Sequence, residues 1–367
     1  MSEIPTEALY DLTRVTDIAV SPTGDRVAFL TREFDPDEDD TISSLWIVSA
    51  DGSRNPHRLT RVSDASSPAW SPDGSKLGFL AAREKDPDLR VGRQVNNADD
   101  SDGEDENMDH ANNGDAVNDE PKPQLWAFDM DRGGDARQVT DRSEGVSEFD
   151  WSPDGEQVVI AARDPTEEER EYLDQRENDG PIEVERLQHK SDGMGYLDEV
   201  MSYLFVVDVE TREERRLDDA NDDGFGVRGG LEPTWGPDNR IAFVANHTDW
   251  PDDSFVRDVY TIDPNGSNRR KITESELAAG RPRWSPAGHR LGFTGRPQNN
   301  LYTPTEVYVA DAETGEYESV SSELDRTLAW TGAPQWLDED TLVALIGDGG
   351  WSRFVLSPYR GATRARF

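Results

Sequence analysis

The side chains that most often carry chemistry occur in this sequence without a catalytic or metal-binding spacing. The chain has no cysteine, which excludes disulfides, thiolate catalysis and cysteine-ligated metals. None of the five histidines forms a His-Glu-x-x-His or a His-x-His pair, the spacings that bring two zinc ligands together. No Gly-x-Ser-x-Gly segment supplies the strained turn that exposes a serine nucleophile. We therefore predict no catalytic residue, no metal site and no cofactor in this chain.

One acidic stretch offers the best case for a bound ion. Residues 99–120 hold ten acids and neither lysine nor arginine, a composition that favours a weakly ordered loop. Asp100, Asp102 and Asp105 are close enough to suggest a calcium site. However, Gly103 is misplaced for an EF-hand loop and no glutamate lies in register, so the loop is the preferred interpretation.

The segments that would position any site belong to a repeated motif. Residues 70–74 read Trp-Ser-Pro-Asp-Gly, which fits a tight turn because proline fixes φ and the final glycine tolerates positive φ. An aromatic residue precedes the turn and apolar β-formers follow it, which predicts a β-hairpin. Further copies lie at 21–24, 151–155, 235–239 and 284–288, with a degenerate copy at 336–340.

A second pair of strand-like segments follows the copies, for example at residues 125–128 and 137–140. Four short strands per repeat are typical of a propeller blade, which must stack in a ring because it cannot bury both faces alone. We predict an all-β fold, a β-propeller of six recognisable four-stranded blades within residues 1–356, with acidic insertions in the second and third. The repeated tryptophans are expected to pack between blades.

The insertion in the third blade carries helix signals. Asp164 as N-cap, Pro165 at the first helical position and the glutamates that follow predict a helix through Glu177. Residues 182–187 alternate like a strand, and the glycine-rich residues 190–198 predict a hairpin loop.

The end of the chain differs from the rest. Residues 349–367 contain four arginines and no acid, and we interpret residues 357–367 as an atypical basic tail. Two explanations stay open: a basic tail with a purpose, or an end unrelated to the original reading frame.

The formal net charge of −39 restricts the classes of molecule that the chain can bind. Such a surface repels nucleic acid and anionic membranes. Only five of the 38 basic residues are lysine, and an acidic, lysine-poor coat is typical of salt-loving organisms, where molar salt screens self-repulsion. An acidic interaction protein at ordinary salt is the alternative. The sequence shows no membrane-spanning stretch and no signal peptide, so we expect a cytoplasmic protein.

Several of these segments together resemble a known family. The Ser-Pro-Asp-Gly blades, residues 17–22, the Ser-Asp-Gly-Met-Gly-Tyr segment at 191–196 and residues 204–209 are similar to the N-terminal propeller of the prolyl oligopeptidase family, in its acylaminoacyl-peptidase branch. The resemblance covers about residues 8–356. TolB-type, WD40-like propellers share the blade motif, and the 191–196 segment is the more specific part.

The resemblance implies a seven-bladed propeller that caps a C-terminal α/β-hydrolase domain with a serine nucleophile. Six blades and no hydrolase domain are found in this sequence, so we interpret the chain as the substrate-gating part of a truncated serine peptidase, inactive alone. Glu183, Glu185 and Arg186 would then face the cavity and contact a peptide terminus, unless they form a solvated strand. The alternative is a stand-alone TolB-like propeller that binds a protein partner.

The expected partners are peptides or a hydrolase domain, and a second copy of the chain if the ring is left open. An open ring of six blades would expose apolar residues at both ends. We expect these to be Ile18, Val20, Val27 and Phe29 at the first blade, and Leu342, Val343 and Leu345 at the sixth.

Overall fold

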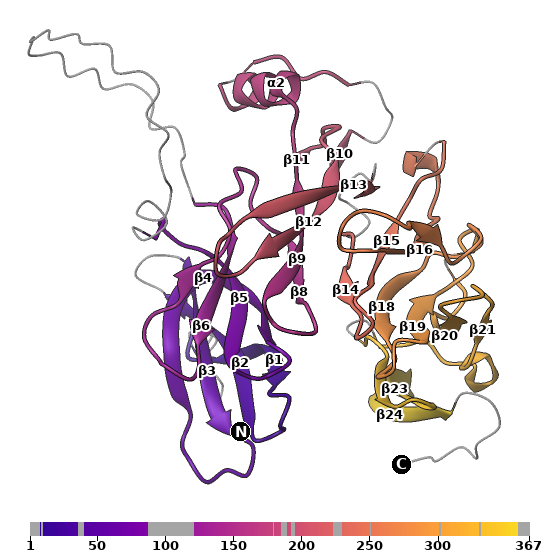
Figure 1. Ribbon diagram of the computed structural model, residues 1–367, viewed down its shortest axis with the longest axis horizontal. Helices are drawn as coiled ribbons and strands as arrows, with labels where there is room; N and C mark the ends of the chain where they lie inside the picture. Colours follow the sequence, from indigo (N-terminus) through magenta and orange to yellow (C-terminus); the bar gives the residue numbers. More distant parts are fainter. Residues whose placement is uncertain are drawn as a thin grey trace, which may run out of the picture.

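The computed structural model describes ten stretches of the chain and the single residue Ala8. The stretches are residues 10–35, 40–86, 121–178, 180–184, 189–191, 195–222, 230–249, 251–300, 302–329 and 332–358. They form six antiparallel blades arranged in an arc, with an opening between the first and the last (Figure 1). The predicted all-β propeller with six blades is therefore confirmed. The described residues contain no helix long and apolar enough to cross a membrane.

The first two blades share one strand. The first contains β1 (Arg14–Val20), β2 (Arg26–Asp35), β3 (Asp40–Ser49) and the first half of β4 (His57–Trp70). The second contains the rest of β4, β5 (Lys76–Ala82), β6 (Gln124–Asp129) and β7 (Arg137–Gln138). Because β4 pairs with β3 along its first half and with β5 along its second, the two blades form one seven-stranded sheet.

The other blades are separate sheets. The third contains β8 (Glu148–Trp151), β9 (Gln157–Arg163), β12 (Ser202–Asp208) and β13 (Glu214–Asp222). The fourth contains β14 (Thr234–Trp235), β15 (Ile241–Ala245), β16 (Asp258–Ile262) and β17 (Arg270–Lys271). The fifth contains β18 (Gly280–Trp284), β19 (Arg290–Gly295), β20 (Glu306–Asp311) and β21 (Tyr317–Ser319). The described part of the sixth contains β22 (Gln335–Asp338), β23 (Thr341–Asp348) and β24 (Trp351–Pro358).

The repeated turn closes the inner hairpin of each blade as predicted. In the second blade the amide of Gly74 donates to the carbonyl of Ser71 at 2.8 Å, and Gly74 has a φ of 73°, which disfavours other residues. The serine is buried, and its Oγ accepts the amide of Lys76 at 2.9 Å while donating to Asp73 at 2.6 Å. In this copy of the motif serine and aspartate thus act as bonding groups beside proline and glycine.

Tryptophans lock neighbouring blades together. Trp151 donates its indole N–H to the carbonyl of Ala69 in the blade before it, and Trp70, Trp284 and Trp336 make the same bond at 2.9–3.2 Å. The indole of Trp151 lies over Gly78, where an added Cβ would approach within 3.0 Å. The predicted packing of tryptophans between blades is confirmed, and the repeated Leu-Gly-Phe in the second strand is explained by the space that the indole needs.

A basic residue makes a second repeated bond between blades. Arg26 and Lys76 each donate to the carbonyl of the turn glycine in the following blade, at 3.2 Å. Arg240 does the same toward Gly288 at 3.3 Å, and Arg290 reaches the carbonyl of Glu339 at 2.6 Å. The few bases of this acidic chain are thus placed partly where they satisfy turn carbonyls between blades.

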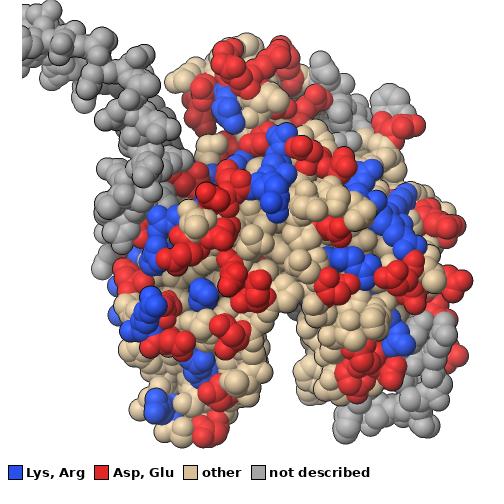
Figure 2. All heavy atoms as spheres, in the orientation of Figure 1, with Lys and Arg blue, Asp and Glu red and all other residues tan. Residues whose placement is uncertain are grey.

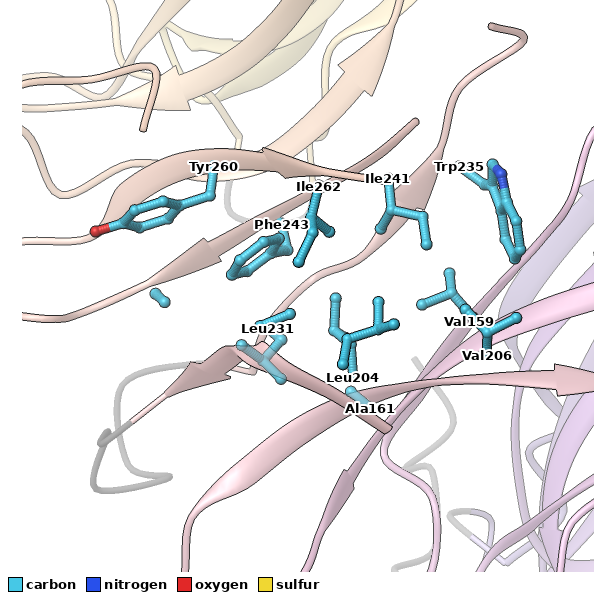
Figure 3. Close-up of a cluster of buried hydrophobic side chains, with 13 residues drawn as sticks. Val159, Ala161, Leu204, Val206, Leu231, Trp235, Ile241, Phe243, Tyr260 and Ile262 are labelled. Carbon is cyan, nitrogen blue, oxygen red and sulfur yellow. The ribbon is translucent and has the colours of Figure 1, made fainter. Parts of the chain in front are cut away.

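The apolar core lies between blades rather than within them. The cluster between the third and fourth blades brings Leu204 and Val206 of β12 against Ile241 and Phe243 of β15, all at most 3% exposed (Figure 3). Burial of such side chains contributes roughly 1.5–3 kcal/mol each. Stacking of blades is therefore the main source of stability, as the repeat pattern implies.

The insertion of the third blade contains the helix α2 (Glu167–Glu177), which projects from the arc of blades (Figure 1). The helix ends at Glu177 as predicted, but its N-cap is Thr166, which forms a capping box with Glu169. Asp164, the predicted cap, instead pairs with Arg142 at 2.6 Å and Arg216 at 2.8 Å. The predicted hairpin follows as β10 (Lys190–Ser191) paired with β11 (Gly195–Tyr196).

The two ends of the arc expose apolar side chains. Ile18 and Val20 of β1 are 62% and 58% exposed, and Phe354 of β24 is 68% exposed. The space-filling view shows a hollow between the two end blades with few charged side chains on its walls (Figure 2). The prediction for the first blade is confirmed for Ile18 and Val20, whereas Val27 and Phe29 are half-buried.

For the sixth blade one predicted residue is wrong. Leu342 is fully buried, because its side chain faces the fifth blade together with Ala344 and Ile346. Val343 and Leu345 point to the other face of β23 and are half-buried. The acidic stretch 99–120, with its calcium alternative, and residues 359–367 of the predicted tail lie outside the described residues.

Candidate functional site

Charged side chains lie three residues before three of the repeated tryptophans, at Glu148, Glu232 and Arg281. An acid at this position accepts the backbone amide of the equivalent residue in the next blade. Glu148 accepts the amide of Glu232 at 2.8 Å, and Glu232 accepts the amide of Arg281. Asp17, three residues before Val20, accepts the amide of Ser67 in the same way. We call Asp17, Glu148, Asp150, Glu232, Arg257, Arg281 and Arg283 the inner rim.

The backbone is bent where this bond is made. Glu232 and Arg281 have φ of 47° and 54°, in the left-handed region, and both precede a proline. Such residues store strain that the surrounding contacts must hold. At Gly230 an added Cβ would overlap the carboxylate of Glu148, so the glycine leaves room for the close approach of this side chain.

Arg257 bonds to two residues at the middle of the inner rim. Its guanidinium pairs with Glu232 at 3.0 Å and also donates to the carbonyl of Gly230. The Arg257 side chain is 12% exposed and that of Glu232 is 22% exposed. The pair is therefore shielded from solvent, where loss of one partner would leave an uncompensated charge.

Asp150 lies two residues nearer the turn than Glu148. Its carboxylate accepts the amide of Trp235 in the next blade at 2.8 Å and that of Trp151 at 2.9 Å. Burial raises the pKa of Asp150, although the bond from Trp235 and the charge of Arg283 oppose this. Burial also raises the pKa of Glu148, and the neighbouring Glu232 carboxylate adds to the effect, while the bond from Glu232, Arg257 and Arg283 oppose it.

The rim can hold charged groups and carry protons, but it offers no nucleophile. Carboxyl groups with raised pKa values next to guanidinium groups are a frequent sign of functional sites. Among the residues that the structure describes, no group of three or more His, Cys, Asp and Glu side chains could hold a metal ion. Sequence reasoning missed the rim, and the only signal for it is the acid that recurs three residues before the tryptophan at Glu148 and Glu232.

The predicted substrate-contact residues are only partly described. Glu183 is exposed, and its backbone amide is held by the hydroxyl of Tyr172 on α2 at 3.0 Å. The described residues 181–184 are not in a strand, contrary to the predicted alternation. Glu185 and Arg186 lie outside the described residues, so peptide contact by these three side chains stays a prediction.

A shallow groove lies away from the rim, on the first blade. It has a volume of about 590 Å³ and is lined by the turn around Asp25 and by residues 47–57, including Arg54 and His57. It shares no residue with the inner rim, and nothing in its lining adds a catalytic pair.

Comparison with known proteins adds a peptidase relative. No protein-family model matches the chain. The chain is 29% identical over 265 residues to the uncharacterized peptidase YuxL of Bacillus subtilis (strain 168), across 71% of this chain and 34% of the relative. The chain thus spans about a third of the length of the curated relative it matches.

Solved structures give the architecture. The acylaminoacyl peptidase of Pyrococcus horikoshii superposes with a TM-score of 0.67 and 17% identity, over 97% of this chain and 46% of that one. The alignment shows that the chain has a β-propeller fold. The propeller domain of the Trilobed protease from Pyrococcus furiosus, which has an open velcro topology, aligns with it at a TM-score of 0.58 and 14% identity over 96% of this chain and 84% of that one.

The chain also resembles a propeller from outside the peptidases. TolB from Acinetobacter baumannii gives a TM-score of 0.51 and 12% identity, over 96% of this chain and 77% of that one. At such identities the likeness concerns the fold alone. The resemblance to the propeller of the prolyl oligopeptidase family is confirmed. The peptidase relative supports it in sequence, and the solved propellers support it in structure.

Proposed function

We propose that this propeller is the substrate-gating part of a serine peptidase that resembles acylaminoacyl peptidase, without hydrolytic activity of its own. The observation that carries the proposal is the alignment of nearly the whole chain with less than half of the Pyrococcus horikoshii enzyme. The similarity to a peptidase in sequence supports the same assignment. The inner rim would then line a route along which only short or unfolded peptides pass.

The test joins the chain to a catalytic domain. The full chain replaces the propeller of the Bacillus subtilis relative, and the chimera is assayed on acyl-dipeptide anilides and on a long unfolded protein. We expect turnover of the short substrate at a rate near that of the free catalytic domain, with the long one rejected by at least tenfold. The chain alone should show no turnover and no labelling by a fluorophosphonate. A chimera that cleaves both substrates equally would refute gating.

A second function is a stand-alone propeller that binds a protein partner. The observation that favours it is the alignment with TolB over 77% of that protein's length, a larger share than for the complete peptidase. The chimera separates the two functions, because a protein-binding module has no reason to discriminate substrates by length.

A further inference from the structure

The junction between the third and fourth blades is bonded differently from the others near the axis. At the other four junctions a tryptophan donates its indole N–H to a carbonyl of the preceding blade. Trp235 instead donates to Asn239 of its own blade at 2.9 Å. The position of the repeated basic residue is occupied by Gln157.

Two carboxylates bond across this junction. The bond of Glu148 has counterparts at Asp17 and Glu232 in other blades, so the bond of Asp150 to Trp235 is the one that sets this junction apart. Glu148 and Asp150 both belong to β8, and each accepts a backbone amide of the fourth blade at 2.8 Å. The charged groups that face Glu148 are Glu232, Arg257 and Arg283, and Arg283 also faces Asp150. Burial raises the pKa of both carboxyls, against the amide bonds and the charge of Arg283. A protonated carboxyl keeps its carbonyl oxygen as an acceptor for the amide, so protonation removes the desolvation cost and leaves a neutral hydrogen bond in place.

This junction lies in the middle of the arc, with three blades on each side (Figure 1). A small rotation at the junction would move the two halves as bodies and would change the distance between β1 and β24 across the opening. A closed ring would resist such a rotation, because every blade would be held on two sides.

We propose that the junction between the third and fourth blades is a proton-sensitive joint that sets how firmly the two halves of the propeller are held apart. Proton uptake by Glu148 and Asp150 tightens the joint and fixes one spacing across the opening. Ionisation loosens the joint and allows a range of spacings. This inference does not depend on the proposed peptidase role.

The absence of cysteines allows the spacing to be measured directly. Thr16→Cys and Ser352→Cys place spin labels on exposed positions of β1 and β24. Pulsed electron paramagnetic resonance then gives the distance distribution from acidic to alkaline pH, at constant molar salt that screens the overall charge. We expect the distribution to broaden at least twofold as pH rises, with a midpoint above the ordinary carboxyl range.

The decisive comparison is the labelled Glu148→Gln, Asp150→Asn double variant, which keeps the acceptor oxygens without the charges. Its distribution should stay narrow at every pH. Asp154→Asn is the matched control, because this acid of the same blade lies in an exposed turn, and it should keep the parent response. If the double variant does not fold, Asp150→Asn alone should shift the midpoint. A parent without pH dependence, or variants that respond like the parent, would overturn the proposal.

Discussion

The indole nitrogen of Trp151 lies 3.1 Å from the carbonyl oxygen of Ala69, one blade earlier in the arc. Trp151→Phe removes this donor and keeps much of the apolar ring. We expect the free energy of unfolding to fall by about 1–3 kcal/mol, because the partly buried carbonyl of Ala69 is left without this donor. Chemical denaturation in high salt measures the loss.

The matched control is Trp351→Phe, since the Trp351 side chain is 71% exposed. This variant should unfold like the parent within about 0.5 kcal/mol. Equal losses for both tryptophans would show that the bond between blades contributes nothing measurable.

The turn of the second blade predicts a pH dependence in acid. The bond from Ser71 Oγ, helped by those from Ser75, lowers the pKa of Asp73 to about 2 from its ordinary 3.8. A folded-state pKa below the unfolded value means that the ionised carboxylate stabilises the fold above the unfolded value. This contribution disappears as pH falls through about 2.

Asp73→Asn should therefore be less stable than the parent at neutral pH. The loss should stay under about 1 kcal/mol, because the side chain is largely exposed and solvent screens its charge. Thermal melts of both proteins from neutral to strongly acidic pH should show the difference shrinking. A difference that grows toward acid would contradict the assignment.

The charge of the chain predicts that salt stabilises it. A formal charge of −39 at neutral pH gives strong self-repulsion, which salt reduces as the screening length falls to about 3 Å at 1 M. The melting temperature should rise by at least ten degrees between millimolar and molar potassium chloride. Sucrose at matched viscosity is the control for effects unrelated to screening. The melting temperature is measured by circular dichroism. The same melting temperature at both salt levels would show that screening does not stabilise the fold.

The exposed ends of the arc predict self-association in high salt, with a second copy as the partner. Ile18 on β1 is an exposed apolar side chain at one end of the arc, and such side chains promote association. Ile18→Asn should weaken association at least tenfold in sedimentation experiments. Tyr302→Asn, at an exposed residue of the fifth blade, is the control and should associate like the parent.

Hydrogen exchange should locate the weakest blades at the same time. Backbone amides of β1 and β24 should exchange faster than those of β9 and β15, because the end blades pack on one neighbour only. A monomer with equal protection in all four strands would show that the ends are covered in solution.

The fold could be predicted because each repeat carries its own local chemistry. The turn around Gly74 and the tryptophan before it need only neighbouring residues, so their pattern is visible in the sequence. The predicted cap of α2 was wrong because the Asp164 carboxylate, a good cap by type, is paired with Arg142 before β8 and with Arg216 of β13. Tertiary ion pairs of this kind leave no trace in local sequence.

The inner rim could not be predicted for a related reason. Glu148 and Glu232 bond to backbone amides of the next blade, and a backbone amide has no signature in the sequence. The shared role of these two acids can be recognised only when the repeats are aligned on the tryptophan and the blades are placed side by side. The predicted exposure of Leu342 was wrong because neighbouring residues of a strand point to opposite faces, and a prediction that is off by one residue exchanges the exposed and the buried face.

The shared strand β4 makes the two ends of the chain mechanically unequal. The first two blades are one sheet through a continuous strand of 14 residues, whereas the sixth blade is a sheet by itself. A force applied at the carboxyl end can peel away a single blade. A force applied at the amino end works against a sheet of seven strands, so degradation or translocation that starts from the carboxyl end should begin at the lower load.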